Sequence, residues 1–422
     1  MTELKKMKRI AGEVSIPGDK SISHRGVMLG ALADGDTVID GFLTGADCLS
    51  TIECFRALGV ETELDGEHVV VHGRGKRGLK KPQDTLYTGN SGTTTRLLCG
   101  ILAAQDFDSV ITGDASICKR PMKRVTGPLS LMGANIDGDY CPLTVHGGKL
   151  QGINYDMTVA SAQVKTAVLL AGLFAEGETV VNEIEKSRDH TELMLAAMGA
   201  DIEVDGLRVR VSAKGDLKPL HINVPGDISS AAFYIAAASV MKDSEVLVKN
   251  VGVNPTRTGI LDAARSMGAD ITELNLRSEN NEPVCDLLIK NAPLHGTRIE
   301  GAIIPRLIDE LPVIAVMAAA AEGETVIADA AELKVKETNR IMAVCTELKK
   351  CGADITETDD GMIIRGGNKL HGADFASYND HRMAMSLAVL AQLTDGECRI
   401  DDTDCVKISY PRFFDDFYGL EA

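Results

Sequence analysis

Two short patterns of polar and apolar residues recur along the whole chain. The first is a helix-like segment that ends in glycine, where a helix C-terminus favours a left-handed residue, and then leads into a strand; it occurs at 57–60, 132–136, 198–202, 267–271 and 351–355. The second is an acidic turn that follows an Ala/Leu-rich helix and precedes a β-branched strand; it occurs at 34–38, 106–110, 176–180, 243–246, 322–326 and 395–399. Six copies of the second pattern predict six α+β units of about 70 residues each.

A third repeat indicates how these units are grouped. The tripeptide Pro-Gly-Asp at 17–19 recurs at 225–227, and a helical pattern follows each copy, the first running from Lys20 to about Ala33. A chain of 422 residues is too long for one core, so we expect two domains of three units, one formed by 20–225 and the other by 1–19 with 226–422. The two crossings, near 17–20 and 224–227, would form a hinge, and hinged domains predict a cleft that closes on a ligand.

Composition narrows the class of protein. The net charge of −17, the absence of Trp and the 4% of aromatic residues argue against non-specific nucleic-acid binding, which needs a basic face or stacking platforms. The N-terminus has no apolar leader, and no apolar run approaches the roughly 18 residues of a membrane span, so we expect a cytoplasmic protein. Ten cysteines without a C-x-x-C pair predict buried thiols rather than disulfides or a zinc site.

Unusual polar residues gather where the apolar helical patterns begin. These residues are Lys20, Ser21, Asn90, Gly92, Arg120, Ser161, Gln163, Asp309, Glu337, Arg340 and Arg382. If the helix N-termini of like units converge, helix dipoles and cations together would form an electropositive pocket inside an acidic protein. The ligand that such a pocket favours is a small polyanion carrying phosphate and carboxylate groups.

Taken singly, each stretch also has an ordinary structural explanation. The Gly- and Thr-rich stretch at 89–96 is equally well explained as a capped helix start, a single Arg120 is usually a solvated charge, and Asp309 is often an N-cap. Asp189, His190 and Glu192 have the spacing of no common metal site. The G-x-G-x-x-G match at 73–78 follows a strand but leads into no helix, so we interpret it as a basic turn.

Six motifs in one order make the combination specific. They are PGDKSISHR at 17–25, GNSGTTTR at 89–96, RP at 120–121, SAQ at 161–163, KETNR at 336–340 and NDHRMAM at 379–385. With them the chain resembles the 3-phosphoshikimate 1-carboxyvinyltransferase (EPSP synthase) family over essentially its full length. The resemblance implies an α/β fold, a two-domain inside-out α/β barrel in which each domain holds three βαβαββ units, the same number that the acidic turns predict.

The resemblance also implies an activity. The family condenses shikimate 3-phosphate with phosphoenolpyruvate, on the path to chorismate and the aromatic amino acids, and releases phosphate. The 5-hydroxyl attacks C2 of phosphoenolpyruvate while C3 is protonated, and the tetrahedral intermediate then loses phosphate and the C3 proton. The family is the target of glyphosate and needs neither a metal nor an organic cofactor. The implied partners are small molecules, with no nucleic acid and no membrane, and we expect a monomer.

Residue roles carry over from the family motif by motif. The shikimate 3-phosphate residues would be Lys20, Ser21, Arg25, Ser161, Gln163, Asp309 and Lys336. The phosphoenolpyruvate residues would be Lys20, Gly92, Arg120, Gln163, Arg340, Arg382 and Lys407. Lys20, Asp309 and Glu337 would be catalytic: Asp309 would accept the 5-hydroxyl proton, and Glu337 would exchange the proton at C3. Asp47, Asn90 and Arg96 would support them, Asp47 and Arg96 as a pair.

Two positions bear on the details of binding. Ala162 stands where some family members have a second serine, so one side-chain contact to the phosphate would be lost there, and Ser187, Arg188 or Lys165 are candidates to supply another. Gly92 matches the members that glyphosate inhibits, whereas bulkier residues at this position are associated with tolerance.

Three other interpretations compete with this one. UDP-N-acetylglucosamine enolpyruvyl transferase shares the fold and the chemistry, but that family would call for Lys-Asn in place of Lys20-Ser21 and for a catalytic Cys loop that Cys118 does not match. A non-catalytic protein that closes on an anion would lack Asp309 and Glu337. A purely structural repeat protein would not carry its special charges at corresponding ends of the units.

Overall fold

The computed structural model describes all residues 1–422, which form two compact units. Unit 1 comprises Met1–Pro17, Pro225–Ser278 and Pro283–Ala422, and unit 2 comprises Gly18–Val224 and Glu279–Glu282. The chain therefore passes between the units at 17–18 and 224–225. The sequence-based division, 20–225 against 1–19 plus 226–422, differs from the observed one at 18–19, at 225 and at 279–282.

The hairpin tip at 279–282 joins unit 2 because of side-chain hydrogen bonds. Asn280 donates from Nδ2 to the backbone oxygen of His221 at 2.7 Å, and its Oδ1 accepts from the backbone N–H of Asn223 at 2.9 Å. Glu282 accepts a hydrogen bond from His190 Nδ1 at 2.6 Å. These contacts join residues far apart in the sequence, so no local pattern indicated them.

Unit 2 contains three four-stranded sheets with one common plan. Their strand orders are β14 (His221–Asn223), β3 (Asp34–Asp40), β5 (His68–Arg74), β4 (Thr62–Asp65); β6 (Leu86–Tyr87), β7 (Ser109–Thr112), β9 (Leu143–His146), β8 (Asn135–Asp137); and β10 (Asn154–Asp156), β11 (Glu178–Asn182), β13 (Arg208–Ser212), β12 (Ile202–Asp205). In each sheet the first pair is parallel and the next pair is antiparallel.

Unit 1 contains sheets of the same plan, and strands from the N-terminus of the chain form the edges of two of its sheets. Two sheets have the orders β2 (Ala11–Ser15), β15 (Glu245–Gly252), β17 (Glu282–Lys290), β16 (Asp270–Glu279) and β18 (Arg298–Ile299), β19 (Gly323–Ile327), β21 (Met362–Gly366), β20 (Asp354–Glu357). The last of the six repeats contains two small sheets. One has the order β1 (Thr2–Leu4), β25 (Cys398–Ile400), β23 (Asp374–Phe375), and the other pairs β22 (Leu370–His371) with β24 (Thr394–Asp395). The six predicted repeats are thus present, three in each unit.

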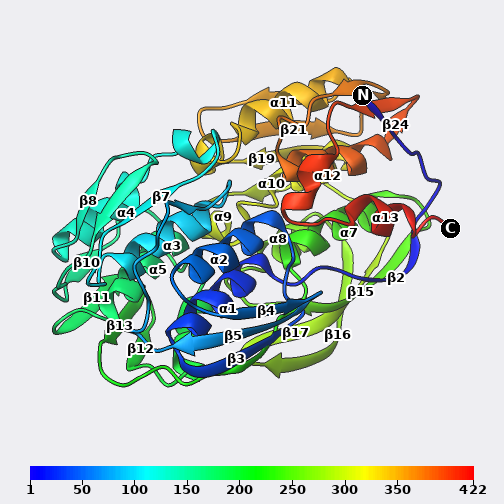
Figure 1. Ribbon diagram of the computed structural model, residues 1–422. Helices are drawn as coiled ribbons and strands as arrows, with labels where there is room; N and C mark the ends of the chain where they lie inside the picture. Colours follow the sequence, from blue (N-terminus) through cyan, green and yellow to red (C-terminus); the bar gives the residue numbers. More distant parts are fainter. The chain divides into compact units, whose positions relative to one another are not determined.

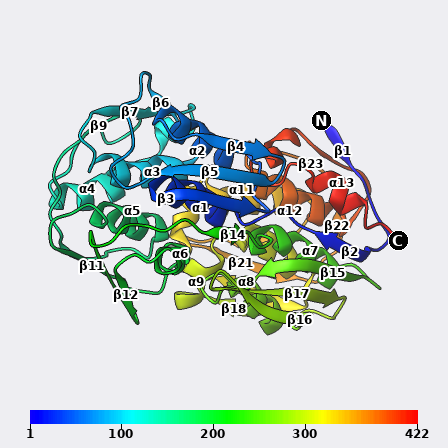
Figure 2. The same cartoon turned by 60° about the horizontal axis from the view of Figure 1, so that its bottom comes forward.

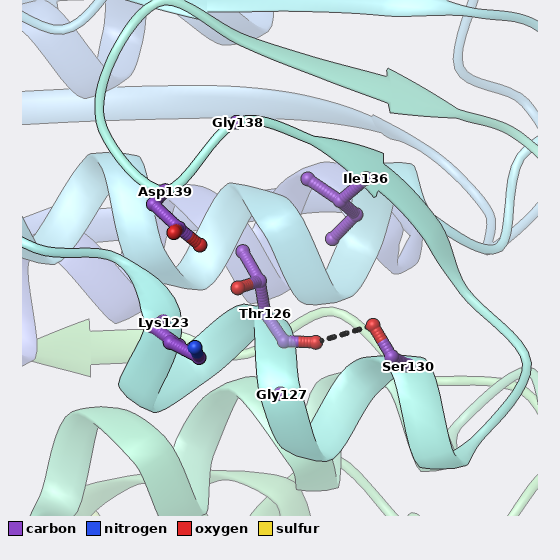
Figure 3. A pocket seen from close by; sticks show the side chains of 7 residues that line it. All are labelled: Lys123, Thr126, Gly127, Ser130, Ile136, Gly138 and Asp139. Carbon is purple, nitrogen blue, oxygen red and sulfur yellow. Dashed lines mark hydrogen bonds between the residues drawn. The ribbon is translucent and has the colours of Figure 1, made fainter.

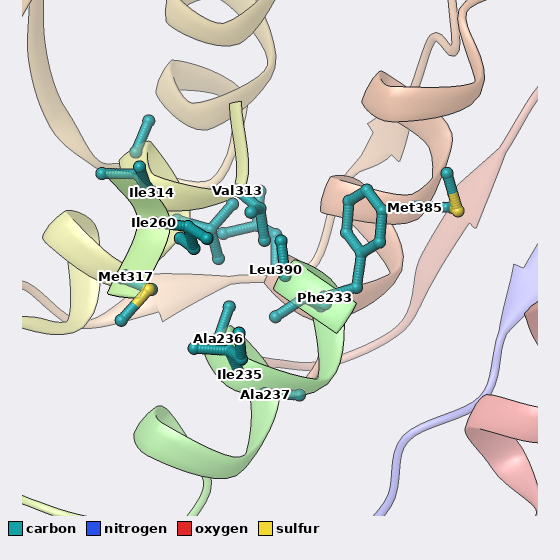
Figure 4. Close-up of a cluster of buried hydrophobic side chains, with 14 of the residues drawn as sticks. Phe233, Ile235, Ala236, Ala237, Ile260, Val313, Ile314, Met317, Met385 and Leu390 are labelled. Atoms are coloured by element: carbon teal, nitrogen blue, oxygen red, sulfur yellow. The ribbon is translucent and has the colours of Figure 1, made fainter. Parts of the chain in front are cut away.

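Three buried helices form the core of each unit. They are α1 (Lys20–Leu32), α3 (Gly92–Leu102) and α5 (Ala162–Gly172) in unit 2, and α7 (Ile228–Val240), α10 (Leu311–Ala320) and α12 (His381–Ala391) in unit 1. Helix α3 lies beside α5 (Figure 1), and α1 packs on the sheet of β3 and β5 (Figure 2). In unit 1, side chains such as Phe233, Val313, Met317 and Leu390 interdigitate between α7, α10 and α12 (Figure 4). Helix α10 is apolar on every side, which is typical of a helix buried all round, whereas α1, α3 and α5 carry polar residues in their first two turns.

The remaining helices lie around these cores. They are α2 (Ala46–Ala57), α4 (Lys123–Leu131), α6 (His190–Ala197), α8 (Gly259–Ser266), α9 (Ile304–Leu307), α11 (Arg340–Lys350) and α13 (Phe413–Tyr418), with 3₁₀ turns η1 (Ile117–Lys119), η2 (Gly301–Ile303), η3 (Ala331–Val335) and η4 (Asp404–Ile408). None of the helices has both the length and the apolar character that crossing a bilayer requires.

The predictions that depend on local backbone conformation are confirmed. The five glycines of the helix-ending pattern all have positive φ, between 80° at Gly199 and 95° at Gly268, as left-handed C-terminal residues should. Helix α1 runs from Lys20 to Leu32, as predicted, and the Gly-rich turn after β5 leads into no helix. Gly18 is required for a different reason: a Cβ there would lie 1.9 Å from the backbone oxygen of Gly41.

A cation pairs with the acidic turn across the strands in five of the sheets. The pairs are His72–Asp36 (2.9 Å), His146–Asp108 (3.2 Å), Arg210–Glu178 (3.3 Å), Lys290–Glu245 (3.1 Å) and Arg365–Glu324 (2.7 Å). The hydrogen bond to Asp36 raises the pKa of His72 above its ordinary value, and carboxylates on both neighbouring strands raise the pKa of His146. Two repeats therefore hold a histidine where three others hold a lysine or an arginine, which stay charged at neutral pH.

We expect the double variant His72→Arg/His146→Arg to raise the unfolding temperature at pH 8 by about 1–2 °C and to leave it unchanged at pH 5.5. A histidine whose folded pKa is raised contributes its ion pair fully below the ordinary pKa of about 6.5 and loses it as the pH rises through the folded pKa, whereas arginine stays charged. Calorimetry at the two pH values measures the difference. An equal shift at both would contradict the assignment.

Candidate functional site

The start of α1 holds the first group of predicted site residues. Asp19 caps the helix, accepting from the backbone N–H of Ile22 at 2.9 Å, and Lys20 and Ser21 follow directly. The ammonium group of Lys20 forms an ion pair with Asp47, which lies in the first turn of α2. The side chain of Lys20 is about one-fifth exposed, so its ammonium group can contact a ligand while it is paired with Asp47.

Arg25 is one turn further along α1 and is almost fully buried. Its Nη1 donates to the backbone oxygen of Ser21 at 2.9 Å, its Nε to Thr191 Oγ1 at 2.7 Å and its Nη2 to Thr166 Oγ1 at 3.1 Å. The two threonines also contact each other at 2.8 Å. Arg25 therefore fastens α1 to the starts of α5 and α6, and its guanidinium is fixed before any ligand arrives.

The start of α3 brings five predicted residues together. Ser91 caps the helix, and Gly92 is its first residue. Arg120 donates from Nη2 to Asn90 Oδ1 at 2.8 Å, and Arg96 donates from Nη1 to Gln163 Oε1 at 2.7 Å. A Cβ on Gly92 would lie 2.6 Å from Arg96 Nη1 and 3.4 Å from Arg120 Nη1. The missing side chain of Gly92 therefore leaves room for two guanidinium groups.

Two of the three supporting residues, Asp47 and Arg96, contact other predicted site residues. Asp47 contacts Lys20, and Arg96 contacts Gln163. Lys20 begins α1, which packs against α2, and this packing brings its ammonium group to Asp47. Asp47 therefore orients Lys20, a predicted substrate-binding residue, and the pair of Asp47 with Arg96 stays a prediction.

A buried polar chain joins the starts of α1, α2 and α3. His24 Nδ1 contacts Thr51 Oγ1 at 2.7 Å, Thr51 Oγ1 contacts Thr94 Oγ1 at 2.7 Å, and Thr94 Oγ1 donates to Ser91 Oγ at 2.7 Å. Burial first, and the neighbouring cations of α1 second, lower the pKa of His24 well below its ordinary value, so this histidine is neutral. The sequence analysis missed this chain because small polar residues inside apolar helices carry no local signal.

The start of α5 holds Ser161 and Gln163. Ser161 is the N-cap and accepts from the backbone N–H of Val164 at 3.5 Å, while Gln163 Nε2 donates to Thr93 Oγ1 at 3.1 Å. Of the three candidates for a further phosphate contact, Lys165 and Ser187 are buried and Arg188 is partly exposed. Lys165 lies between Glu183 and Glu192, two acids that the sequence analysis did not select.

Asp309 and the start of α11 form the corresponding group in unit 1. Asp309 Oδ1 lies 3.5 Å from Lys336 Nζ and 3.3 Å from Arg340 Nη1, and its Oδ2 lies 4.0 Å from Arg382 Nη2. Glu337 Oε2 accepts from Arg340 Nη2 at 2.7 Å. Both predicted catalytic acids thus share one arginine, and each keeps between a seventh and a fifth of its side chain exposed.

Arg340 is the most buried member of this group, with 1% of its side chain exposed. Asp380, fully buried, accepts from its Nε at 2.8 Å and from its Nη2 at 3.2 Å. Burial alone would lower the pKa of Arg340, but Asp380, Glu337 and Asp309 together raise it, so the charge is permanent. The sequence analysis missed Asp380, although its position just before an apolar helix is a recognisable N-cap signal.

Arg382 is the second residue of α12 and lies beside this cluster. Its backbone N–H donates to Asp380 Oδ1 at 2.9 Å, and its Nη1 lies 3.7 Å from Glu310 Oε1. Ser229, at the start of α7, donates to the same Glu310 oxygen. The starts of α7, α10, α11 and α12 therefore meet in unit 1, which confirms that helix N-termini converge within a unit.

Two features lie apart from these groups. The ion pair of Lys407, 65% exposed, is with Asp404 in its own 3₁₀ turn, at 2.7 Å, and no contact places it in the Asp309 group. A hollow between α4 and the strand β8 is lined by Lys123, Thr126, Ser130 and Asp139 (Figure 3) and contains none of the predicted site residues.

Comparison with known proteins identifies a family for this arrangement. The chain matches the family described as EPSP synthase (3-phosphoshikimate 1-carboxyvinyltransferase) over residues 4–417. It is 55% identical over 417 residues to the 3-phosphoshikimate 1-carboxyvinyltransferase of Geobacillus thermodenitrificans, covering 97% of this chain and 96% of the relative. It is 55% identical over 419 residues to the enzyme of that name from Brevibacillus brevis, covering 98% of each.

Solved structures agree with the predicted fold. EPSP synthase from Acinetobacter baumannii superposes with a TM-score of 0.89 at 45% identity and covers 100% of this chain and 98% of its own. The enolpyruvyl transferase NikO from Streptomyces tendae superposes with a TM-score of 0.82 at 18% identity, covering 99% of this chain and 96% of its own, a likeness of fold alone. The predicted two-domain inside-out α/β fold is therefore confirmed.

Proposed function

The chain belongs to the EPSP synthase family, and from this premise we propose how its helix-start residues carry out the reaction of that family. The enzyme transfers the enolpyruvyl group of phosphoenolpyruvate to the 5-hydroxyl of shikimate 3-phosphate and releases phosphate. The observation that supports the assignment of roles is the Asp309 group, in which two carboxylates stand among three cations at the start of buried helices.

Asp309 accepts the proton of the 5-hydroxyl. Its oxygens lie within 4.0 Å of Lys336, Arg340 and Arg382, so the carboxylate is held in place while part of it stays open to a substrate hydroxyl. A general base must be within hydrogen-bond reach of the proton that it takes. Loss of this proton allows the hydroxyl oxygen to attack C2 of phosphoenolpyruvate.

Glu337 exchanges the proton at C3. Protonation of C3 as C2 is attacked gives the methyl group of the tetrahedral intermediate, and removal of a proton from the same carbon accompanies loss of phosphate. Arg340 fixes the carboxyl group through Oε2, and the exposed fifth of the side chain keeps it accessible. One carboxyl group can serve both steps because it gives a proton in the first and takes one in the second.

Cations bind the two substrates and stabilise the intermediate. Phosphoenolpyruvate is held by Lys20, Gly92, Arg120, Gln163, Arg340, Arg382 and Lys407, and shikimate 3-phosphate by Lys20, Ser21, Arg25, Ser161, Gln163, Asp309 and Lys336. Most of these side chains are already bonded to a neighbour, as Lys20 is to Asp47 and Arg120 is to Asn90. Preorganised cations stabilise developing charge without the cost of reorienting solvent.

The proposed chemistry is an addition followed by an elimination, with proton transfers that carboxyl groups can perform, so it needs neither a metal nor an organic cofactor. All ten cysteines are free thiols, which supports the proposal that the enzyme works in a reducing compartment such as the cytoplasm. We propose that it acts as a monomer.

We expect phosphate release from phosphoenolpyruvate to require shikimate 3-phosphate and to continue in excess EDTA, because acid–base groups carry every step. A phosphate-release assay with each substrate omitted in turn measures this dependence. Release with UDP-N-acetylglucosamine and none with shikimate 3-phosphate would overturn the proposed acceptor.

Glu337→Gln should lower kcat by about a hundredfold or more, because the amide cannot exchange a proton with carbon. The calorimetric affinity for shikimate 3-phosphate should stay within about threefold of the wild-type value, because Glu337 is not among the residues proposed to bind this substrate. Glu332→Gln is the matched control, because Glu332 also lies near Lys336, at 3.8 Å, but touches neither Arg340 nor Asp309. A Glu337→Gln enzyme with the wild-type rate would remove Glu337 from the mechanism.

Gly92→Ala should raise the Michaelis constant for phosphoenolpyruvate and the glyphosate inhibition constant, each by about tenfold, because its Cβ displaces Arg96 and crowds Arg120. The control is Gly127→Ala in α4, where an added Cβ meets no atom within 4 Å. Steady-state kinetics with and without glyphosate distinguish the two variants. Unchanged inhibition in Gly92→Ala would show that Gly92 does not line the phosphoenolpyruvate pocket.

A further inference from the structure

Unit 2 encloses a group of three charges that the proposed mechanism does not use. Lys165 on α5, Glu183 after β11 and Glu192 on α6 have side chains that are 0%, 0% and 2% exposed. Lys165 Nζ lies 3.0 Å from Glu183 Oε1 and 2.6 Å from Glu192 Oε1. Charges so fully removed from water are costly, and a packed apolar trio would often be at least as stable, so stability alone is a weak reason for them.

Glu183 connects this group to the turn before α6. Its Oε1 accepts from both the backbone N–H of Ser187, at 3.0 Å, and the Ser187 hydroxyl. Lys165 donates to the backbone oxygen of the same serine at 3.3 Å. Three atoms of Ser187 are thus fixed by Glu183 and Lys165, and no sheet or helix hydrogen bond fixes this turn in their place.

The same turn adjoins residues assigned to shikimate 3-phosphate. Arg188 follows Ser187, and Thr191 holds the guanidinium of Arg25 together with Thr166, the neighbour of Lys165 on α5. Lys165 itself is one helical turn from Ser161. A displacement of Ser187 would therefore reach groups that flank the proposed phosphate position, although none of the three buried charges can touch a ligand.

Glu192 makes a different contribution from Glu183. It contacts Lys165 but not Ser187, and burial raises the pKa of its carboxyl group. The two acids thus share one lysine, and only one of them is bonded to the turn.

We propose that Glu183, with Lys165 as its counterion, is a positioning residue for shikimate 3-phosphate, which acts by fixing the turn at Ser187. This inference rests on the proposed function of unit 2 in binding that substrate. The side chain of Glu183 never meets the reacting atoms, so its loss should weaken binding of one substrate and leave the chemical step intact.

The test compares Glu183→Met with Glu192→Met. Each variant removes one carboxylate from Lys165, leaves a balanced pair with the other, and fills the space with an unbranched apolar side chain. We expect Glu183→Met to weaken calorimetric binding of shikimate 3-phosphate about tenfold, because the N–H of Ser187 loses its acceptor. The kcat and the Michaelis constant for phosphoenolpyruvate should stay within about twofold, and Glu192→Met should bind within about twofold of wild type.

Glu183→Gln serves if the methionine variant does not fold. It keeps the shape and an acceptor oxygen but loses the charge that draws it to Lys165, so we expect weakening of about threefold. Wild-type affinity in whichever Glu183 variant folds, or equal weakening in Glu183 and Glu192 variants, would overturn the proposal. Failure of the wild-type enzyme to bind shikimate 3-phosphate would instead overturn the proposed function.

Discussion

The burial of six helices in the cores of the two units is the constraint on which the rest of this structure depends. Each helix leaves four N–H groups at its start and four carbonyl groups at its end without partners within the helix. Asp19, Ser91 and Asp380 satisfy such N–H groups in α1, α3 and α12. The predicted site residues on α1, α3, α5 and α12 accordingly lie in the first two turns of these helices, next to the unpaired N–H groups.

Within each unit, carboxylates and hydroxyls hold the cations before a ligand can. Lys20 has Asp47, Arg25 has two threonines, and Arg340 has Asp380 at its deepest point. This arrangement resolves an apparent conflict between a net charge of −17 and a proposed polyanionic ligand. Asp380 offsets the cost of burying the guanidinium of Arg340, and two threonines set the direction of Arg25, so the local field at the helix starts depends on these contacts and not on the overall charge.

The sequence predicted features that depend on neighbours along the chain and missed features that depend on neighbours in space. The glycines that end the helices and the acidic turns are local signals of backbone conformation, so the six repeats could be recognised. The contact between Asp47 and Lys20 could not be predicted, because it depends on how α1 packs on α2. Lys165 is a second example: the sequence offered it as a candidate phosphate contact, and only the fold shows that it is buried between two acids. Asp380 was within reach, since an Asp before an apolar helix is a capping signal.

The positions of the paired strands along the chain make the two units differ during synthesis. Unit 2 is nearly one continuous stretch, and its first sheet is completed when β14, its last strand, emerges and pairs with β3. Unit 1 begins with β1 and β2, yet their partners β25 and β15 are translated only after nearly all of unit 2 has been made. The first seventeen residues therefore leave the ribosome long before they have anything to pair with. During synthesis, nearly all of unit 2 is therefore available to fold before the partners of β1 and β2 exist.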